Sequence, residues 1–99
     1  MVKAHPKKVG AAGDGTSVAI GRPCVFWGFM VGTAAADPTI TVYDNATTNS
    51  GVELVPTTTY DASALGLNGA MLGAGVWCDY GITVDVTCAG AWEVTVYYS

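Results

Sequence analysis

Positive charge is almost missing from this chain after its eighth residue. Lys3, Lys7 and Lys8 supply three of the four basic side chains, and Arg22 is the fourth. All eight acidic residues come later, so residues 9–99 carry a net charge of −7, one positive against eight negative. Because binding to phosphates needs a basic face, this distribution argues against nucleic acid as a partner of the folded body.

Groups that catalyse reactions or bind metals are equally scarce. The single histidine, His5, stands beside Pro6 in the basic start, so no pairing with a serine or cysteine nucleophile is indicated. Cys24, Cys78 and Cys88 form no C-x-x-C motif. We expect them to be buried thiols, and the spacing leaves open whether any two pair. The acids are spread one per turn, as turn capping would place them. We therefore expect no enzyme, no cofactor and no metal site.

Long apolar segments are also missing. Residues 1–15 contain lysines but no apolar core of the kind that signal peptides need. The longest weakly polar stretch, residues 24–36, is too short to cross a bilayer as a helix. We therefore expect synthesis in a cytoplasm and no membrane partner.

What is abundant is apolar and β-branched side chains. Hydrophobic residues make up 51% of the 99 residues and charged residues only 12%, against about 25% charged in an average domain. A small domain with so few charges has to leave apolar surface exposed, and contiguous apolar patches usually mark contact sites. We therefore expect the chain to bind a partner and to form a homo-oligomer.

The pattern from residue 16 onward predicts short strands broken by Gly, Asn, Asp and Pro. The predicted strands are residues 17–21, 24–33, 39–44, 52–55, 57–60, 70–72, 76–80, 82–87 and 92–97, with a turn near residues 63–65. Together they predict an all-β chain with a single small β-sandwich or jelly-roll-like domain over residues 16–99. Residues 1–15 are predicted to be a basic, flexible N-terminal arm, with Gly10, Gly13 and Gly15 as its hinge.

Three local predictions are specific enough to be tested by a structure. Residues 82–87 and 92–97 alternate with period two across Ala89-Gly90, which indicates a hairpin. In residues 24–33 the alternation places Trp27 on one face with Phe29, and we expect Trp27 and Trp92 in the core. Asn45-Ala46-Thr47 matches a glycosylation sequon but is more simply a turn.

Four segments become informative when they are taken together. They are G-R-P-C at residues 21–24, P-T-I-T-V-Y-D-N at 38–45, G-I-T-V-D-V at 81–86 and W-E-V-T-V-Y-Y at 92–98. In this order they resemble the small β-sandwich virion proteins of tailed bacteriophages, over most of residues 20–99. The resemblance implies a virion structural protein, most simply a head decoration (cement) protein that binds and stabilises the shell of the major capsid protein. It supplies no catalytic residues, and it leaves open a tail, neck or fibre component.

Contact with the partner is expected from the basic arm and from aromatic side chains, which are enriched at interfaces. The candidate interface residues are Lys3, His5, Lys7, Lys8, Trp77, Tyr97 and Tyr98. In this reading the arm tethers the protein to acidic shell subunits. The alternative is a glycan-binding host-attachment module, in which tryptophan and tyrosine side chains provide a stacking platform.

Overall fold

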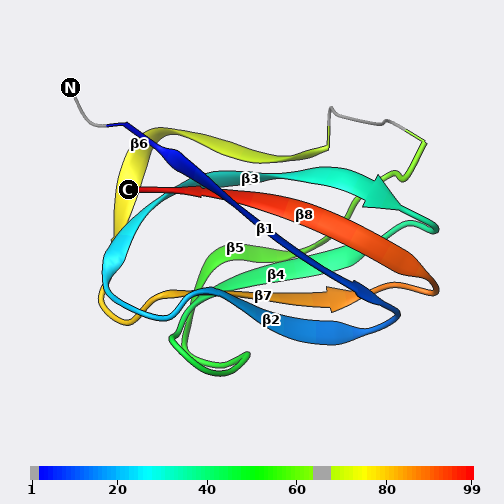
Figure 1. Ribbon diagram of the computed structural model, residues 1–99, viewed down its shortest axis with the longest axis horizontal. Coiled ribbons are helices and arrows are strands. Elements are labelled where there is room, and N and C mark those ends of the chain that lie inside the picture. The colour runs from blue at the N-terminus through cyan, green and yellow to red at the C-terminus, as the bar shows by residue number, and fades with distance from the viewer. Residues whose placement is uncertain (1–2, 64–67) are drawn as a thin grey trace.

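The chain folds into two layers of β-structure. The computed structural model describes residues 3–63 and 68–99, and these contain no helix. Figure 1 shows the layers stacked one above the other, with the strands of each running along the longest axis. The strands, in chain order, are β1 (His5–Ala12), β2 (Gly15–Ile20), β3 (Cys24–Ala34), β4 (Thr39–Asp44), β5 (Val52–Thr59), β6 (Gly69–Cys78), β7 (Ile82–Thr87) and β8 (Ala91–Tyr98).

The order of the strands within the two sheets defines the topology. Sheet A has the order β1-β8-β3-β6 and sheet B the order β2-β7-β4-β5, with every pairing antiparallel. Every connection except that between β4 and β5 therefore passes from one sheet to the other. This is the topology of an eight-stranded jelly roll. The predicted all-β sandwich or jelly-roll-like fold is confirmed.

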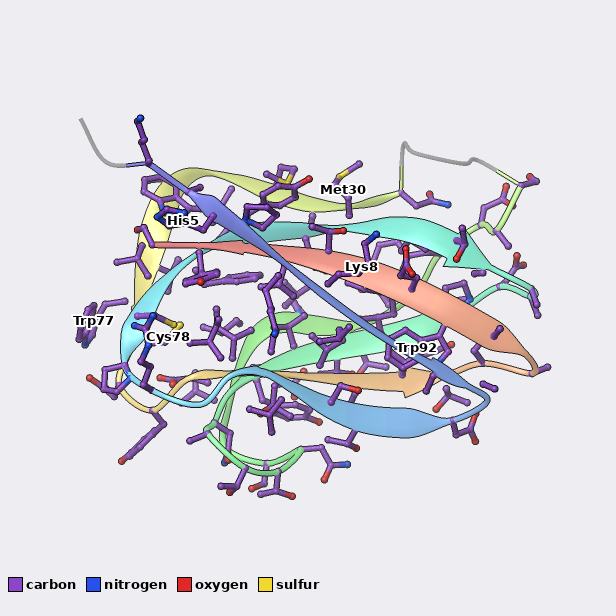
Figure 2. All side chains as sticks on the ribbon, viewed as in Figure 1. His5, Lys8, Met30, Trp77, Cys78 and Trp92 are labelled. Atoms are coloured by element: carbon purple, nitrogen blue, oxygen red, sulfur yellow. The ribbon has the colours of Figure 1, made fainter. Side chains whose placement is uncertain are left out.

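The core lies between the sheets and is built from alternating apolar side chains. On β7 these are Ile82 and Val84, and on β8 they are Val94 and Val96, all fully buried. Figure 2 shows Trp92 between the two layers, and it is 3% exposed, as predicted. Each fully buried side chain of this kind contributes about 1.5–3 kcal/mol relative to its exposed state.

The segment predicted to be a flexible arm is a strand instead. β1 pairs with β8 along its whole length, from His5 opposite Tyr98 to Ala12 opposite Ala91. Of its side chains only Val9 packs against the core, so the segment lacks the apolar alternation that reveals a strand in a sequence. Main-chain hydrogen bonds to β8 hold it in place.

The predicted glycine hinge is also fixed. Three hydrogen bonds hold the connection between β1 and β2: Gly13 N donates to Gly90 O (3.0 Å), Trp92 Nε1 donates to Gly13 O (2.7 Å), and Cys88 N donates to Asp14 Oδ1 (2.8 Å). These bonds form only when the β7–β8 connection lies alongside, which local sequence cannot reveal. Residues 5–15 therefore belong to the sandwich.

The predicted hairpin at the end of the chain is wrong. β7 lies in sheet B between β2 and β4, whereas β8 lies in sheet A between β1 and β3. The connection at residues 88–90 crosses between the sheets, so the two strands face each other across the core. Alternation with period two specifies which side of a strand is buried and leaves its hydrogen-bonded partner open.

A β-bulge at Gly28 changes which side chains of β3 face the core. The register with both neighbouring strands shifts between Phe26 and Gly28, and Gly28 has a φ of 131°, which favours glycine. Phe26 and Phe29 are consequently both fully buried. The prediction that Trp27 shares a face with Phe29 is therefore wrong.

Two pairs of predicted short strands are single longer strands. Residues 52–55 and 57–60 fall largely within β5, where Pro56 is accommodated because β5 is at the edge of sheet B. Residues 70–72 and 76–78 fall within β6. Of the turn predicted near residues 63–65, residue 63 lies in a turn, and residues 64 and 65 lie outside the described residues.

Candidate interaction surface

Most of the predicted interface residues lie on the neighbouring strands β1 and β8. His5 is opposite Tyr98, with the two rings 5.8 Å apart between centroids. Lys7 and Lys8 follow on β1 and are exposed, and Tyr97 precedes Tyr98 on β8. Lys3 is exposed just before β1. The pairing of the two strands thus joins the basic start of the chain to its aromatic end.

Trp77 lies at the opposite edge of the same sheet and at the same end. A row across sheet A runs through His5, Tyr98, Phe26 and Val76. Trp77 follows directly on β6 and is 61% exposed, and its Nε1 donates to Asp79 Oδ1 at 2.9 Å. Figure 2 shows its side chain projecting away from the end of the sandwich. The fold therefore gathers the predicted residues at one end of sheet A.

Between these two edges, sheet A turns an apolar face outward. In the register Val25 lies opposite Trp77, while Met71 and Tyr97 flank β3 at Gly28. None of these four side chains belongs to the buried core or packs against it. We refer to the side chains of this face as the outer apolar surface: Val25, Trp27, Met30, Met71, Trp77 and Tyr97.

Trp27 belongs to this surface, so its predicted place in the core is wrong. Its indole is half-buried, and Nε1 donates to the Ser99 hydroxyl at 2.9 Å. Gly75 on β6 leaves room for the indole ring, because a Cβ at this position would lie 3.0 Å from Trp27 Cζ2. Two glycines on neighbouring strands thus make the position of Trp27 possible. The bulge at Gly28 lets Trp27 point outward while Phe29 points inward, and Gly75 leaves room for the indole.

The two methionines of the surface were not identified from the sequence. Met71 is 54% exposed on β6, and Figure 2 shows Met30 on the side of sheet A turned away from sheet B. Methionine is adaptable in contact and is enriched at interfaces. A glycine inside a strand often marks a bulge, so Gly28 was the one sequence signal that Met30 could point outward.

Positive charge borders the surface along β1. Lys8 Nζ lies 3.3 Å from Glu93 Oε1, with both side chains largely exposed, and such a pair contributes about 0–1 kcal/mol. Arg22 places its guanidinium carbon 5.9 Å from the centroid of the Tyr98 ring. Lys7 is exposed but lies opposite the buried Val96, on the core-facing side of β1, and no salt bridge involves it among the described residues.

A buried carboxylate organises the loop that follows Trp77. Asp44, 8% exposed, accepts hydrogen bonds from the main-chain N–H groups of Asp79 (3.0 Å), Tyr80 (3.0 Å) and Gly81 (3.3 Å). Because Trp77 donates to Asp79, this loop also orients the indole. Asp44 ends β4 and stands far from residue 79 in the sequence, which explains why its role could not be read there.

The predicted capping of turns by acids is confirmed for some of them, whereas Glu53, Asp85 and Glu93 lie within strands β5, β7 and β8. Asp37 Oδ1 accepts from Ala62 N at 2.8 Å, and Asp61 Oδ1 accepts from Ser63 N and from its hydroxyl. Those two hydrogen bonds lower the pKa of Asp61, the side-chain bond being the larger cause. Asn45 Oδ1 accepts from Thr47 N at 2.9 Å, so the sequon-like segment is a turn. No group of three or more potential metal ligands occurs among residues 3–63 and 68–99.

All three cysteines are buried free thiols, as predicted. Burial raises the pKa of Cys78 to about 12 and also raises the pKa of Cys24. Neutral thiols of this kind serve as small apolar side chains.

Comparison of the chain with protein-family models, with curated proteins and with solved structures finds no match. In the part of the chain that the structure describes, no helix has the length and apolar character needed to cross a membrane. The surface of sheet A therefore has to be interpreted from its own chemistry.

Proposed function

We propose that this protein is a non-enzymatic virion structural protein of a tailed bacteriophage, a decoration protein that binds and stabilises the shell of the major capsid protein. The observation that carries the proposal is the outer apolar surface, an outward sheet face on which Trp77 is 61% and Met71 54% exposed. A small protein that stayed alone in solution would gain nothing from exposing a tryptophan and a methionine on one face.

The composition of this surface suits a protein partner. Aromatic residues, methionine and arginine are enriched in the buried centre of interfaces, and charged groups belong to the rim. Here the centre carries no charge, and Lys7 and Lys8 lie on β1 at one margin. An acidic surface of the shell would complement the charge of that margin. The lysines would then still tether the protein to the shell, although they lie on strand β1 and not on a flexible arm.

The fold is compatible with such a role. Jelly rolls occur in viral capsid domains and in lectins, an analogy of fold that by itself assigns no function. On a symmetric shell each copy repeats the same contact, so a modest affinity per copy is multiplied over the particle. Contacts between copies of this chain would add to the effect.

The experiment is a binding assay on purified capsid shells. Trp77→Ala should lower the affinity for shells by about 10-fold or more, because truncation of an aromatic hot spot at an interface costs about 2 kcal/mol or more. Val52→Ala is the matched control, since Val52 is 70% exposed on sheet B. The two variants should unfold at the same temperature as the parent protein. Equal occupancy of both variants would contradict the proposal.

The lysines are tested separately in the same assay. Lys7→Gln with Lys8→Gln should weaken binding and reduce its dependence on salt, because two exposed charges no longer meet the shell. Their removal leaves the main-chain pairing of β1 with β8 in place. A particle reconstruction would distinguish a position on the head from one in the tail, neck or fibre.

A glycan-binding attachment module is the second candidate, and one observation favours it. Tyr80 is 64% exposed and follows Trp77 on the loop held by Asp44, so two aromatic rings and the Asp79 carboxylate are close in the chain. A screen of host surface polysaccharides should then show saturable binding that Tyr80→Ala abolishes and Met71→Ala leaves intact. Absence of binding to any glycan would eliminate this candidate.

A further inference from the structure

Cys24 and Cys78 face each other across neighbouring strands of sheet A. The antiparallel register of β3 and β6 places them directly opposite, 3% and 0% exposed. The Cys78 thiol donates to the carbonyl oxygen of Val76 at 3.7 Å. Figure 2 shows Cys78 pointing into the sandwich, whereas its neighbour Trp77 points away from it.

The main-chain bonding shows what kind of pair they form. Val25 exchanges both of its hydrogen bonds with Ser99, at 2.9 and 3.0 Å, so its main-chain groups point away from β6. The main-chain N–H and C=O groups of Cys24 therefore point toward β6. Cys24 and Cys78 thus form a hydrogen-bonded pair of the antiparallel strands β3 and β6. Such pairs have Cα atoms about 5.5 Å apart, inside the range of about 4.4–6.8 Å that disulfides span. The Cα separation of such a pair therefore suits a disulfide.

We propose that Cys24 and Cys78 form a cross-strand disulfide by exchange with a small-molecule disulfide such as oxidised glutathione, while Cys88 stays reduced. Cys88 lies near the other end of the sandwich, where its Sγ–H donates to Ala36 O at 3.5 Å. The inference concerns the protein's own chemistry and does not rest on the proposed function.

The reaction balances as an ordinary thiol–disulfide exchange. The Cys24 thiolate attacks one sulfur of the small disulfide, which breaks that bond and releases one thiolate. The Cys78 thiolate then attacks the Cys24 sulfur of the mixed disulfide and releases the second. The protein loses two protons and two electrons, and the small disulfide is reduced to two thiols. Burial raises the pKa of both thiols, and at Cys24 the charge of Arg22 opposes part of that rise.

Access controls the rate of this reaction. Both thiols are buried and protonated in the folded protein, so exchange has to proceed through opening of β6 or before folding is complete. β6 is an edge strand that pairs only with β3, and its register is interrupted opposite Trp27. Opening of β6 should therefore be the easiest route, and closure of the bond should then fix the strand that carries Trp77.

The test is refolding of the full chain with oxidised glutathione, followed by intact-mass measurement and peptide mapping. The parent protein should lose the mass of two hydrogens, the mapped link should join Cys24 to Cys78, and Cys88 should remain open to alkylation after unfolding. The oxidised form should melt about 10 °C or more above the reduced form. A link that includes Cys88, or no link at all, would overturn the proposal.

Two variants provide the controls. Cys88→Ala should still lose the two hydrogens and gain thermal stability, whereas Cys78→Ala should do neither. Because peptide mapping of the parent protein identifies the bond directly, the result does not depend on whether Cys78→Ala folds. A stabilised but unlinked protein would also count against the inference, since the gain has to come from the bond.

Discussion

The indole Nε1 of Trp92 donates a 2.7 Å hydrogen bond to the carbonyl oxygen of Gly13, joining a buried ring of the core to the connection between β1 and β2. Trp92→Phe keeps a buried aromatic ring and removes this donor. We expect a loss of about 1–2 kcal/mol and a melting temperature lower by about 4–16 °C. Hydrogen exchange should show lower protection of β1 than of β3.

Trp27→Phe is the matched control for that variant. It removes an indole N–H of similar geometry, but its acceptor, the Ser99 hydroxyl, is half-exposed and can bond to water. We expect less than about half of the destabilisation. Equal effects of the two variants on β1 protection would show that Trp92 does not secure this strand through Gly13.

Asp44→Asn tests how the loop after β6 is held. The carboxylate accepts three main-chain N–H groups, and an amide would present its own N–H groups to some of them. We expect destabilisation of about 2–4 kcal/mol and faster exchange of the amides of residues 79–81. Asp85→Asn should change stability by less than about 0.5 kcal/mol, since Asp85 accepts from the exposed Thr16 hydroxyl.

Gly28→Ala and Gly73→Ala form a second matched pair. At Gly28 a Cβ would fall against the carbonyl oxygen of Ala70 and 2.8 Å from Met71 Cα, in a backbone conformation with a φ of 131°. We expect a loss of about 3 kcal/mol or more, measured by denaturant unfolding. At Gly73 no atom lies within 4 Å of the added Cβ, and stability should change by less than about 1 kcal/mol.

The thiol of Cys78 predicts a dependence of stability on alkaline pH. Burial raises its pKa from 9.0 to about 12, so between these values the unfolded chain loses a proton that the folded protein keeps. The stabilisation is complete below pH 9 and is lost as the pH rises toward about 12. Unfolding of the reduced protein over this range should show a steeper loss of stability than unfolding of Cys78→Ala. Parallel curves would contradict the prediction.

Local sequence patterns predicted where the strands lie better than which strands pair with each other. Residues 82–87 and 92–97 were correctly predicted as strands, because alternation depends only on which side of a strand meets water. The hairpin between these strands was wrong, because pairing depends on where the chain turns between sheets. β1 was missed for a related reason: its stability comes from main-chain bonds to β8, and its side chains carry almost no apolar signal.

The candidate surface was partly predictable as well. Trp77 and Tyr97 stood out as aromatic side chains with no clear place in the core, and the lysines stood out by charge. Trp27 was assigned wrongly, because the bulge at Gly28 interrupts the alternation, so that Trp27 and Phe29 point to opposite faces of sheet A. The alternation of residue types along β3 does not reveal this bulge.

The sequence by itself determined an all-β chain, an apolar interior, buried thiols and some carboxylates that cap turns, since each of these follows from the chemistry of neighbouring residues. Only the tertiary structure decided that the basic start lies beside the aromatic end, that Cys24 faces Cys78, and that Trp27 lies outside the core. The physical reason is that strand pairing and bulges are set by contacts between residues distant in the sequence, whose energies no local pattern records.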